Sequence, residues 1–157
     1  MENCKTEIEE EFGLICYLDD QRLLSYDQFM SWAVKRCEMG LFSQAYFEST
    51  SIVDAMEILK SEYSAIRPSE EVLLSKIAEE YFSGTLNIQT AVGGAYELLN
   101  MDGNGTHRLS MILYSLVDDH STETIEEFSR RANDIFIPRL EKHVGLYKQL
   151  YNRVFCT

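Results

Sequence analysis

Residues 25–40 read SYDQFMSWAVKRCEMG, and this stretch has the signature of an amphipathic helix. Its apolar side chains recur at spacings of three and four: Tyr26, Phe29, Met30, Ala33, Val34 and Cys37. Ser25 followed by Gln28 three positions later predicts a capping box at the start of the helix. Gly40 predicts the end of the helix, because glycine readily adopts the left-handed backbone conformation of a C-terminal cap. The stretch therefore predicts one well-delimited helix.

The same periodicity continues on both sides of this helix. Upstream, Ile8, Phe12 and Ile15 predict a first helix that ends near Asp19 and Asp20. Downstream, apolar stripes run through residues 52–63, 73–82, 88–99, 109–117, 125–136 and 140–154. Ser51 and Asn87 are the expected N-caps of the helices that follow them. The helix with the stripe over 73–82 is expected to open with Pro68 in its first turn and to end at Gly84. Pro138 should end or kink the helix over 125–136.

No run of alternating apolar and polar residues predicts a sheet, and only residues 41–47 and 86–88 leave room for a short strand. No internal repeat or low-complexity linker divides the chain. We therefore expect an all-α fold, a single domain over residues 1–157 built as a bundle of about seven amphipathic helices. Gly93 and Gly94 predict either a close helix–helix contact or a helix break.

The composition places the chain among cytoplasmic globular proteins. Its 157 residues are 45% hydrophobic, which suits one packed core. The N-terminus lacks a basic segment followed by an apolar run, and no apolar stretch is long enough to span a membrane. The cysteines are scattered and form no C-x-x-C pair, so we expect free thiols in a reducing compartment: Cys4, Cys16, Cys37 and Cys156.

The net charge of −12 points to a basic partner. Residues 1–129 hold 24 acidic and 8 basic side chains, whereas residues 130–157 hold 2 and 6. Such acidity opposes direct binding to nucleic acid and accelerates encounter with a cationic protein. The alternative explanation is that the charge only keeps the protein soluble.

The sequence lacks a complete motif for metal, cofactor or covalent chemistry. Residues 102–106 (DGNGT) begin like a calcium loop, but His107 replaces the expected glycine and Leu113 the bidentate glutamate. The segment Asp118-Asp119-His120 fits a polar helix end better than a metal site. No nucleophile motif or phosphate loop occurs, so we expect no metal, no cofactor and no enzymatic activity.

The sequence resembles the small acidic helical immunity proteins of bacterial contact-dependent growth inhibition and polymorphic-toxin systems. The likeness lies in size, acidity and helicity, and in residues 23–40 (LLSYDQFMSWAVKRCEMG) followed by a second amphipathic helix. It implies a protein that binds a basic toxin domain, a nuclease above all, and blocks it by forming a stoichiometric complex.

The carboxylates that we expect to contact such a toxin fall into two groups. They are Glu70, Glu71, Glu79 and Glu80, and then Asp118, Asp119, Glu123, Glu126 and Glu127. Trp32 lies off the apolar stripe of its helix, which suits an interface anchor. The competing and favoured interpretation is that Trp32 lies in a core that buries two faces of its helix.

Two other classes of function stay open. Arg139 and His143 are spaced almost like the late Arg and His of small all-helical ribonucleases of the HEPN type. One residue is missing between them, however, and Leu140 stands where a polar residue is expected. A non-catalytic scaffold or interaction domain is the third alternative.

Overall fold

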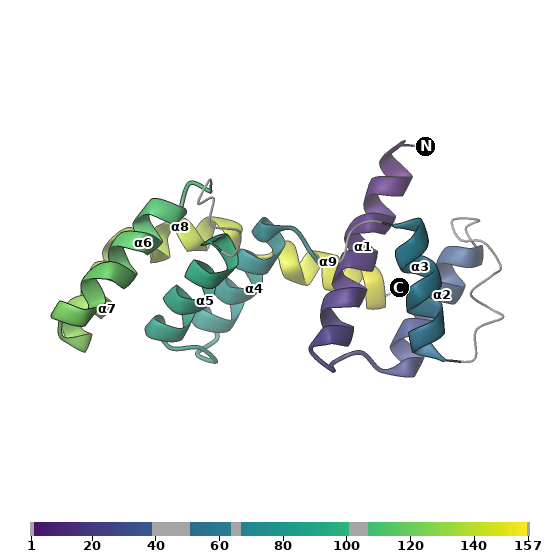
Figure 1. Ribbon diagram of the computed structural model, residues 1–157, viewed down its shortest axis with the longest axis horizontal. Helices are drawn as coiled ribbons and strands as arrows, with labels where there is room; N and C mark the ends of the chain where they lie inside the picture. The colour runs from purple at the N-terminus through teal and green to yellow at the C-terminus, as the bar shows by residue number, and fades with distance from the viewer. Residues whose placement is uncertain (1, 39–50, 64–66, 101–106, 157) are drawn as a thin grey trace. The chain divides into compact units, whose positions relative to one another are not determined.

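The computed structural model describes residues 2–38, 51–63, 67–100 and 107–156 (Figure 1). The chain divides into two compact units, residues 1–69 with 149–157 and residues 70–148. Every regular element in the described ranges is helical, which confirms the all-α class. The elements are α1 (Glu2–Asp20), α2 (Tyr26–Glu38), α3 (Ile52–Glu62), α4 (Glu70–Phe82), α5 (Ile88–Asn100), α6 (Ser110–Asp119), η2 (His120–Thr122), α7 (Ile125–Ile135), α8 (Ile137–Leu140), η3 (Glu141–His143) and α9 (Leu146–Phe155).

The number of helices is slightly higher than expected. Eight of the described α-helices have ten or more residues, against a prediction of about seven. The predicted terminal helix over 140–154 is wrong in its first part. Gly145 lies between η3 and α9 with φ at 100°, a backbone conformation that interrupts the helix. Glycine adopts this conformation without strain, whereas other residues do not. The single domain over residues 1–157 stays a prediction.

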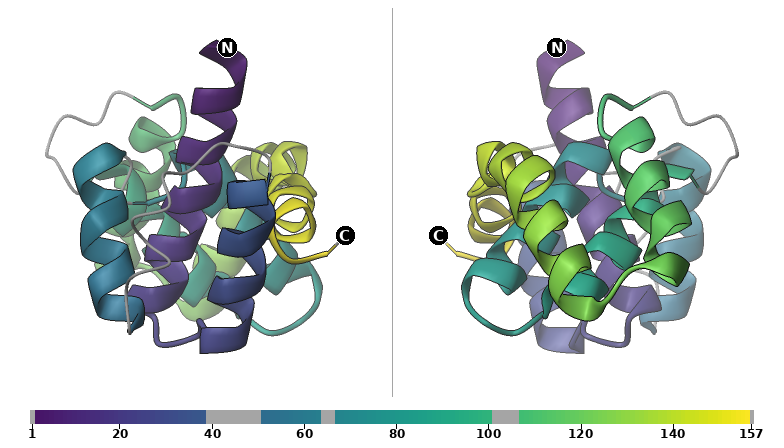
Figure 2. Two further views of the ribbon diagram at one scale, coloured as in Figure 1. Left: turned by 90° about the vertical axis from the view of Figure 1, so that its right-hand side faces the viewer. Right: turned by 90° about the vertical axis from the view of Figure 1, so that its left-hand side faces the viewer.

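The first unit has an aromatic core between side chains of α1, α2 and Tyr63. Helix α1 lies between α3 and α9 (Figure 2). The ring of Phe12 stacks on Trp32 with centroids 6.4 Å apart and meets Tyr63 at 6.0 Å. A Cβ atom at Gly13 would lie 2.6 Å from the carbonyl oxygen of Arg67. Glycine at position 13 therefore lets residues 67–68 pass directly against α1.

A buried carboxylate lies beside this aromatic core. Glu11 is fully buried on α1 and forms ion pairs with Arg36 of α2 and Arg153 of α9. Arg153 also pairs with Glu10, at 3.0 Å. These contacts tie the C-terminal helix to the first unit, because a buried carboxylate without its cations would be costly.

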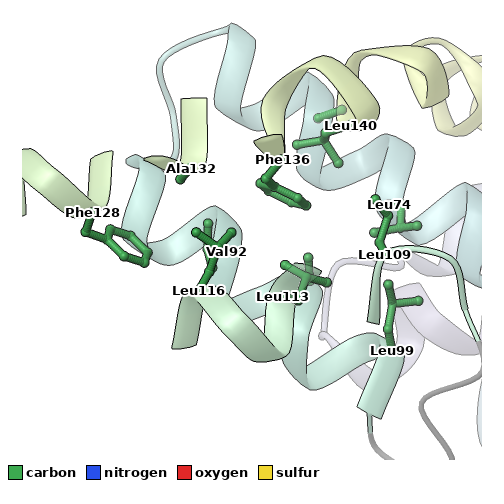
Figure 3. Packing of buried hydrophobic residues seen from close by; sticks show 12 residues of the cluster. Leu74, Val92, Leu99, Leu109, Leu113, Leu116, Phe128, Ala132, Phe136 and Leu140 are labelled. Carbon is green, nitrogen blue, oxygen red and sulfur yellow. The ribbon is translucent and has the colours of Figure 1, made fainter. Parts of the chain in front are cut away.

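The second unit has a mainly aliphatic core. Leucines of α4, α5 and α6 interdigitate with two phenylalanines, Phe128 of α7 and Phe136 at its end (Figure 3). Both Gly93 and Gly94 lie inside a continuous α5, which excludes a break. A Cβ at Gly94 would lie 3.7 Å from Cδ1 of Ile77, so Gly94 faces α4 at ordinary contact distance.

Most predicted helix ends are confirmed. Ser25 and Gln28 form the reciprocal capping box, Ser51 accepts from the N–H of Asp54, and Asn87 accepts from that of Thr90. Gly84 ends α4 at φ 83°. The stop predicted at Gly40, the room for a short strand over residues 41–47, and the calcium-like segment 102–106 lie outside the described residues.

Several side chains of the predicted apolar stripes are exposed, which corrects the expected helix faces. The buried residues of α2 are Phe29, Trp32 and Ala33, whereas Tyr26 is exposed although it belongs to the predicted stripe. The other exposed members of predicted stripes are Phe82, Val117, Ile125 and Val144. None of the described helices is both long and apolar enough to cross a membrane.

Candidate functional site

Trp32 is not available as an interface anchor. Its side chain is 1% exposed and packs between Phe12 and Phe29, so the core interpretation is correct. A residue off one apolar stripe can still be buried when its helix packs against neighbours on two sides. The candidate site must therefore be sought among the charged residues.

Three of the four carboxylates proposed on α4 have partners within the second unit. Glu79 accepts from the backbone N–H of Gly145 at 3.0 Å and from the Ser75 hydroxyl at 3.4 Å. Glu80 pairs with Lys76 one turn earlier. Glu71 contacts two imidazole rings, described below. Only Glu70 has no hydrogen bond or ion pair with another described residue, so this group is mainly a set of internal contacts.

Glu71 joins two histidines that are far apart in the sequence. One carboxylate oxygen lies 2.7 Å from Nε2 of His107, and the other lies 2.6 Å from Nδ1 of His143. The two imidazole centroids are 6.3 Å apart. The segment before α6, the first turn of α4 and η3 therefore meet at one carboxylate, which histidine spacing in the sequence did not reveal.

The hydrogen bonds of His107 define its tautomer. Its Nδ1 accepts from the backbone N–H of Leu109 at 3.1 Å, so its proton is on Nε2 and is donated to Glu71. A metal-bound histidine would instead donate from its second nitrogen to an acceptor. This arrangement opposes metal binding through His107. Among the described residues, no group of three His, Cys, Asp or Glu side chains is placed to hold a metal ion.

His143 is oriented differently. It donates from Nδ1 to Glu71, which leaves Nε2 outside that contact. Arg139, its proposed partner in the ribonuclease alternative, directs its guanidinium to the carbonyl of Ile135 at 2.6 Å. The two residues lie in different short helices, α8 and η3. A carboxylate therefore orients His143, and Arg139 makes its described contact elsewhere.

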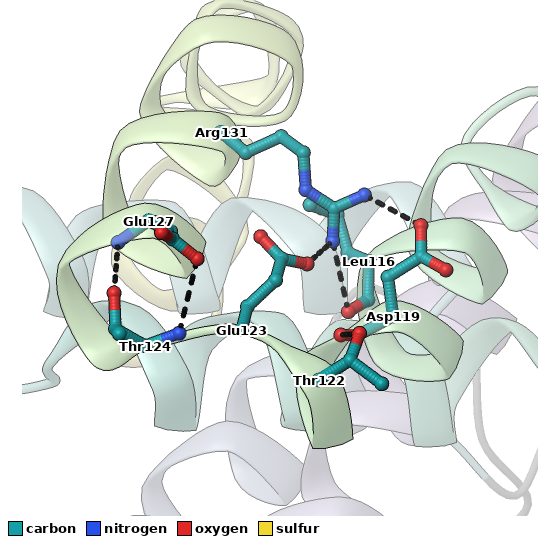
Figure 4. Close-up of polar contacts among 7 residues, drawn as sticks. All are labelled: Leu116, Asp119, Thr122, Glu123, Thr124, Glu127 and Arg131. Carbon is teal, nitrogen blue, oxygen red and sulfur yellow. Dashed lines mark hydrogen bonds and ion pairs between the residues drawn. The ribbon is translucent and has the colours of Figure 1, made fainter.

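The second proposed group lies at the corner where α6, η2 and α7 meet (Figure 4). Arg131 of α7 donates to Asp119, at 2.9 Å, and also pairs with Glu123. The same guanidinium lies 3.4 Å from the carbonyl oxygen of Leu116, near the end of α6. One arginine thus neutralises two of the five carboxylates and fixes the geometry of the corner.

The other three carboxylates of this corner are exposed. Glu127 belongs to the capping box of α7, in which Thr124 and Glu127 bond reciprocally. Asp118 and Glu126 form no hydrogen bond or ion pair with another described residue and lie open to solvent. The structure therefore brings negative charge to the surface around α6 and the start of α7.

Cys16 is no candidate nucleophile. It is buried on α1, and burial raises the pKa of its thiol to about 11. Reactive cysteines instead have lowered pKa values and partial exposure, because the thiolate is the nucleophile. Cys156 is exposed and free, whereas the side chains of Cys4 and Cys37 lie outside the described set.

Sequence reasoning missed the exposed apolar residues beside the acidic corner. Met111 and Tyr114 of α6 are 75% and 56% exposed, and Ile125 begins α7 with its side chain exposed. The signal was present for Met111 and Tyr114, since both fall outside the predicted stripe of Leu109, Ile112, Leu113, Leu116 and Val117. Ile125, by contrast, belongs to the predicted stripe of its own helix. No protein-family model, curated protein or solved structure matches the chain.

Proposed function

We propose that this protein is a bacterial immunity protein that binds and blocks a basic toxin domain, a nuclease above all, by forming a stoichiometric complex. The observation that carries the proposal is the excess of surface carboxylates over the cations that could neutralise them. Asp118, Glu126 and Glu70 are at the surface without an ion pair to another described residue. A field of this sign attracts cationic proteins and repels nucleic acids.

The proposal assigns charge and apolar contact to different steps. Carboxylates around α6 and α7 accelerate the encounter with the toxin and select for lysine and arginine in its substrate groove. Exposed apolar side chains such as Met111 and Tyr114 become buried in the complex and lengthen its lifetime. The chain itself supplies no chemical step, and the compartment of its action is the bacterial cytoplasm.

A rescue experiment tests this proposal. If a neighbouring gene encodes a toxin domain, this domain is expressed in cells with and without this chain, and survival is counted. We expect survival only with the chain, and a one-to-one complex on gel filtration. Continued killing with the folded chain present at equal or higher concentration would contradict the proposal. Cells that carry the empty vector in place of this chain serve as the negative control.

The ribonuclease alternative keeps one supporting observation, the Glu71–His143 contact. A carboxylate bonded to Nδ1 is the arrangement that orients an imidazole for proton transfer at Nε2. The purified chain should then cleave RNA, and both Arg139→Ala and His143→Ala should abolish cleavage. We favour the immunity proposal, because RNA approaches a protein of net charge −12 against electrostatic repulsion.

A further inference from the structure

An exposed ridge follows one side of α6. Met111, Tyr114 and Asp118 stand at spacings of three and four, which places them in one row, and Val117 lies beside them, partly exposed. We call these four residues the α6 ridge. The opposite side of the helix faces the core through Leu113 and Leu116, both fully buried. The outer side of α6 therefore exposes large apolar side chains to solvent, where polar residues would be expected.

The charge around the α6 ridge has a single sign. Residues 110–129 include five carboxylates and no lysine or arginine. Arg131 reaches in from α7 and pairs with Asp119 and Glu123, which leaves Asp118, Glu126 and Glu127 as the exposed negative groups. An apolar centre with a charged rim is the usual composition of a protein-binding surface.

The surface is also held in place before any partner arrives. The Arg131 guanidinium fastens the last turn of α6 to α7, and Thr124 and Glu127 cap the first turn of α7. At the other end of α6, the N–H of Leu109 is bonded to His107, which in turn is held by Glu71. A prearranged surface loses less entropy on binding.

The charge of the α6 ridge and the spacing of its residues indicate which kind of partner can bind there. Two copies of this chain packed ridge to ridge would bring like charges together, which opposes self-association. Nucleic acids and anionic membranes are repelled for the same reason. The described residues offer no strand edge to which an extended segment could add. A row at spacings of three and four instead fits the groove between side chains of another helix.

Resting on the proposed function, we propose that the α6 ridge binds a basic amphipathic helix of the toxin. Apolar side chains of that helix pack on Met111 and Tyr114, while its lysines and arginines lie against Asp118, Glu126 and Glu127. Helix α6 has ten residues and is therefore about 15 Å long, enough to contact two to three turns of a partner helix.

The test uses a peptide of lysine and leucine, about five helical turns long and amphipathic as a helix. The probe is titrated into the full-length chain labelled with ¹⁵N, beside a scrambled peptide of identical composition. We expect chemical-shift changes concentrated in α6 and the first turn of α7, and clearly weaker binding of the scrambled peptide. Absent binding, equal binding of both peptides, or shifts centred elsewhere would each overturn the inference.

Matched variants separate apolar contact from general acidity. Tyr114→Ala and Met111→Lys should each weaken peptide binding at least about fivefold, as expected for central contacts. Tyr26→Ala removes a similarly exposed tyrosine from the first unit and should leave the affinity unchanged. If the chain still rescues cells from the toxin while Met111→Lys and Tyr114→Ala rescue equally well, the proposed function stands and the α6 ridge is excluded.

Discussion

The two units carry the same charge but use it differently. Each contains 13 acidic and 7 basic residues, a net −6, which together make the −12 of the chain. The first unit buries a carboxylate, Glu11, between two arginines beside an aromatic core. The second unit has an aliphatic core and leaves carboxylates exposed around Met111 and Tyr114. Net charge therefore locates no binding surface; the placement of carboxylates relative to cations and apolar groups does.

The largest effect that tests this contrast is the loss of a core aromatic from the first unit. Trp32→Ala removes a buried indole that contacts Phe12 and Phe29, so the free energy of unfolding should fall by about 3–5 kcal/mol. Met111→Ala in the second unit removes a side chain that is 75% exposed and should change stability by less than about 0.5 kcal/mol. Urea unfolding measures both, and similar losses would refute the assignment of core and surface.

Loss of the buried charge should come next. Glu11→Gln removes the buried carboxylate that pairs with Arg36 and Arg153 and should destabilise the protein by about 3 kcal/mol. Glu80→Gln breaks a pair with Lys76 that is partly exposed on one helix face, so its cost should stay below about 1 kcal/mol. An equal cost for the two substitutions, again from urea unfolding, would show that the Glu11 contacts contribute no more than a surface pair.

Alkaline pH provides a third test of the closed core. Burial raises the pKa of Cys16 from 9.0 to about 11, so the folded state retains a proton that the unfolded state releases. The associated stability is complete below pH 9 and is lost as the pH rises to 11, by about 2–3 kcal/mol. Cys16→Ala lacks this contribution. Its unfolding free energy should therefore decline less steeply over this interval, and identical slopes would contradict the burial of the thiol.

The smallest stability effect distinguishes two adjacent carboxylates. Glu71→Gln replaces an oxygen that accepts from a histidine with an amide that donates, and should cost about 1–2 kcal/mol. Glu70→Gln alters a neighbour in the same helical turn without such contacts and should cost less than about 1 kcal/mol. Thermal unfolding of the two variants gives the comparison; a greater loss for Glu70→Gln would argue against the Glu71 cluster.

Much of the fold could be predicted from local signals. Capping pairs such as Ser25 with Gln28, and the stop at Gly84, depend on residues within one turn, and these predictions are confirmed. The interruption at Gly145 was missed because the stripe through Leu140 and Val144 continues across it. Periodicity reports which residues are apolar, and it does not report the backbone conformation between them.

The candidate site was less accessible to sequence reasoning. The contacts of Glu79 with Gly145, and of Glu71 with His107 and His143, depend on long-range packing. Ser75, by contrast, lies one turn before Glu79 on the same helix. Nothing within α4 indicates that Glu71 and Glu79 also accept hydrogen bonds from residues outside this helix. The exposure of Met111 and Tyr114 could have been predicted, since both fall off the buried stripe of α6.

The most direct measurement is the rate at which this chain associates with the basic toxin domain that we propose as its partner, followed by stopped-flow fluorescence. The account predicts a rate constant that falls about tenfold or more as salt rises from about 50 to 500 mM, because charge steers the encounter. Replacing Asp118 and Glu126 by lysine should slow association and flatten this salt dependence. An association rate that responds neither to salt nor to these two substitutions would contradict docking by the acidic α6–α7 surface.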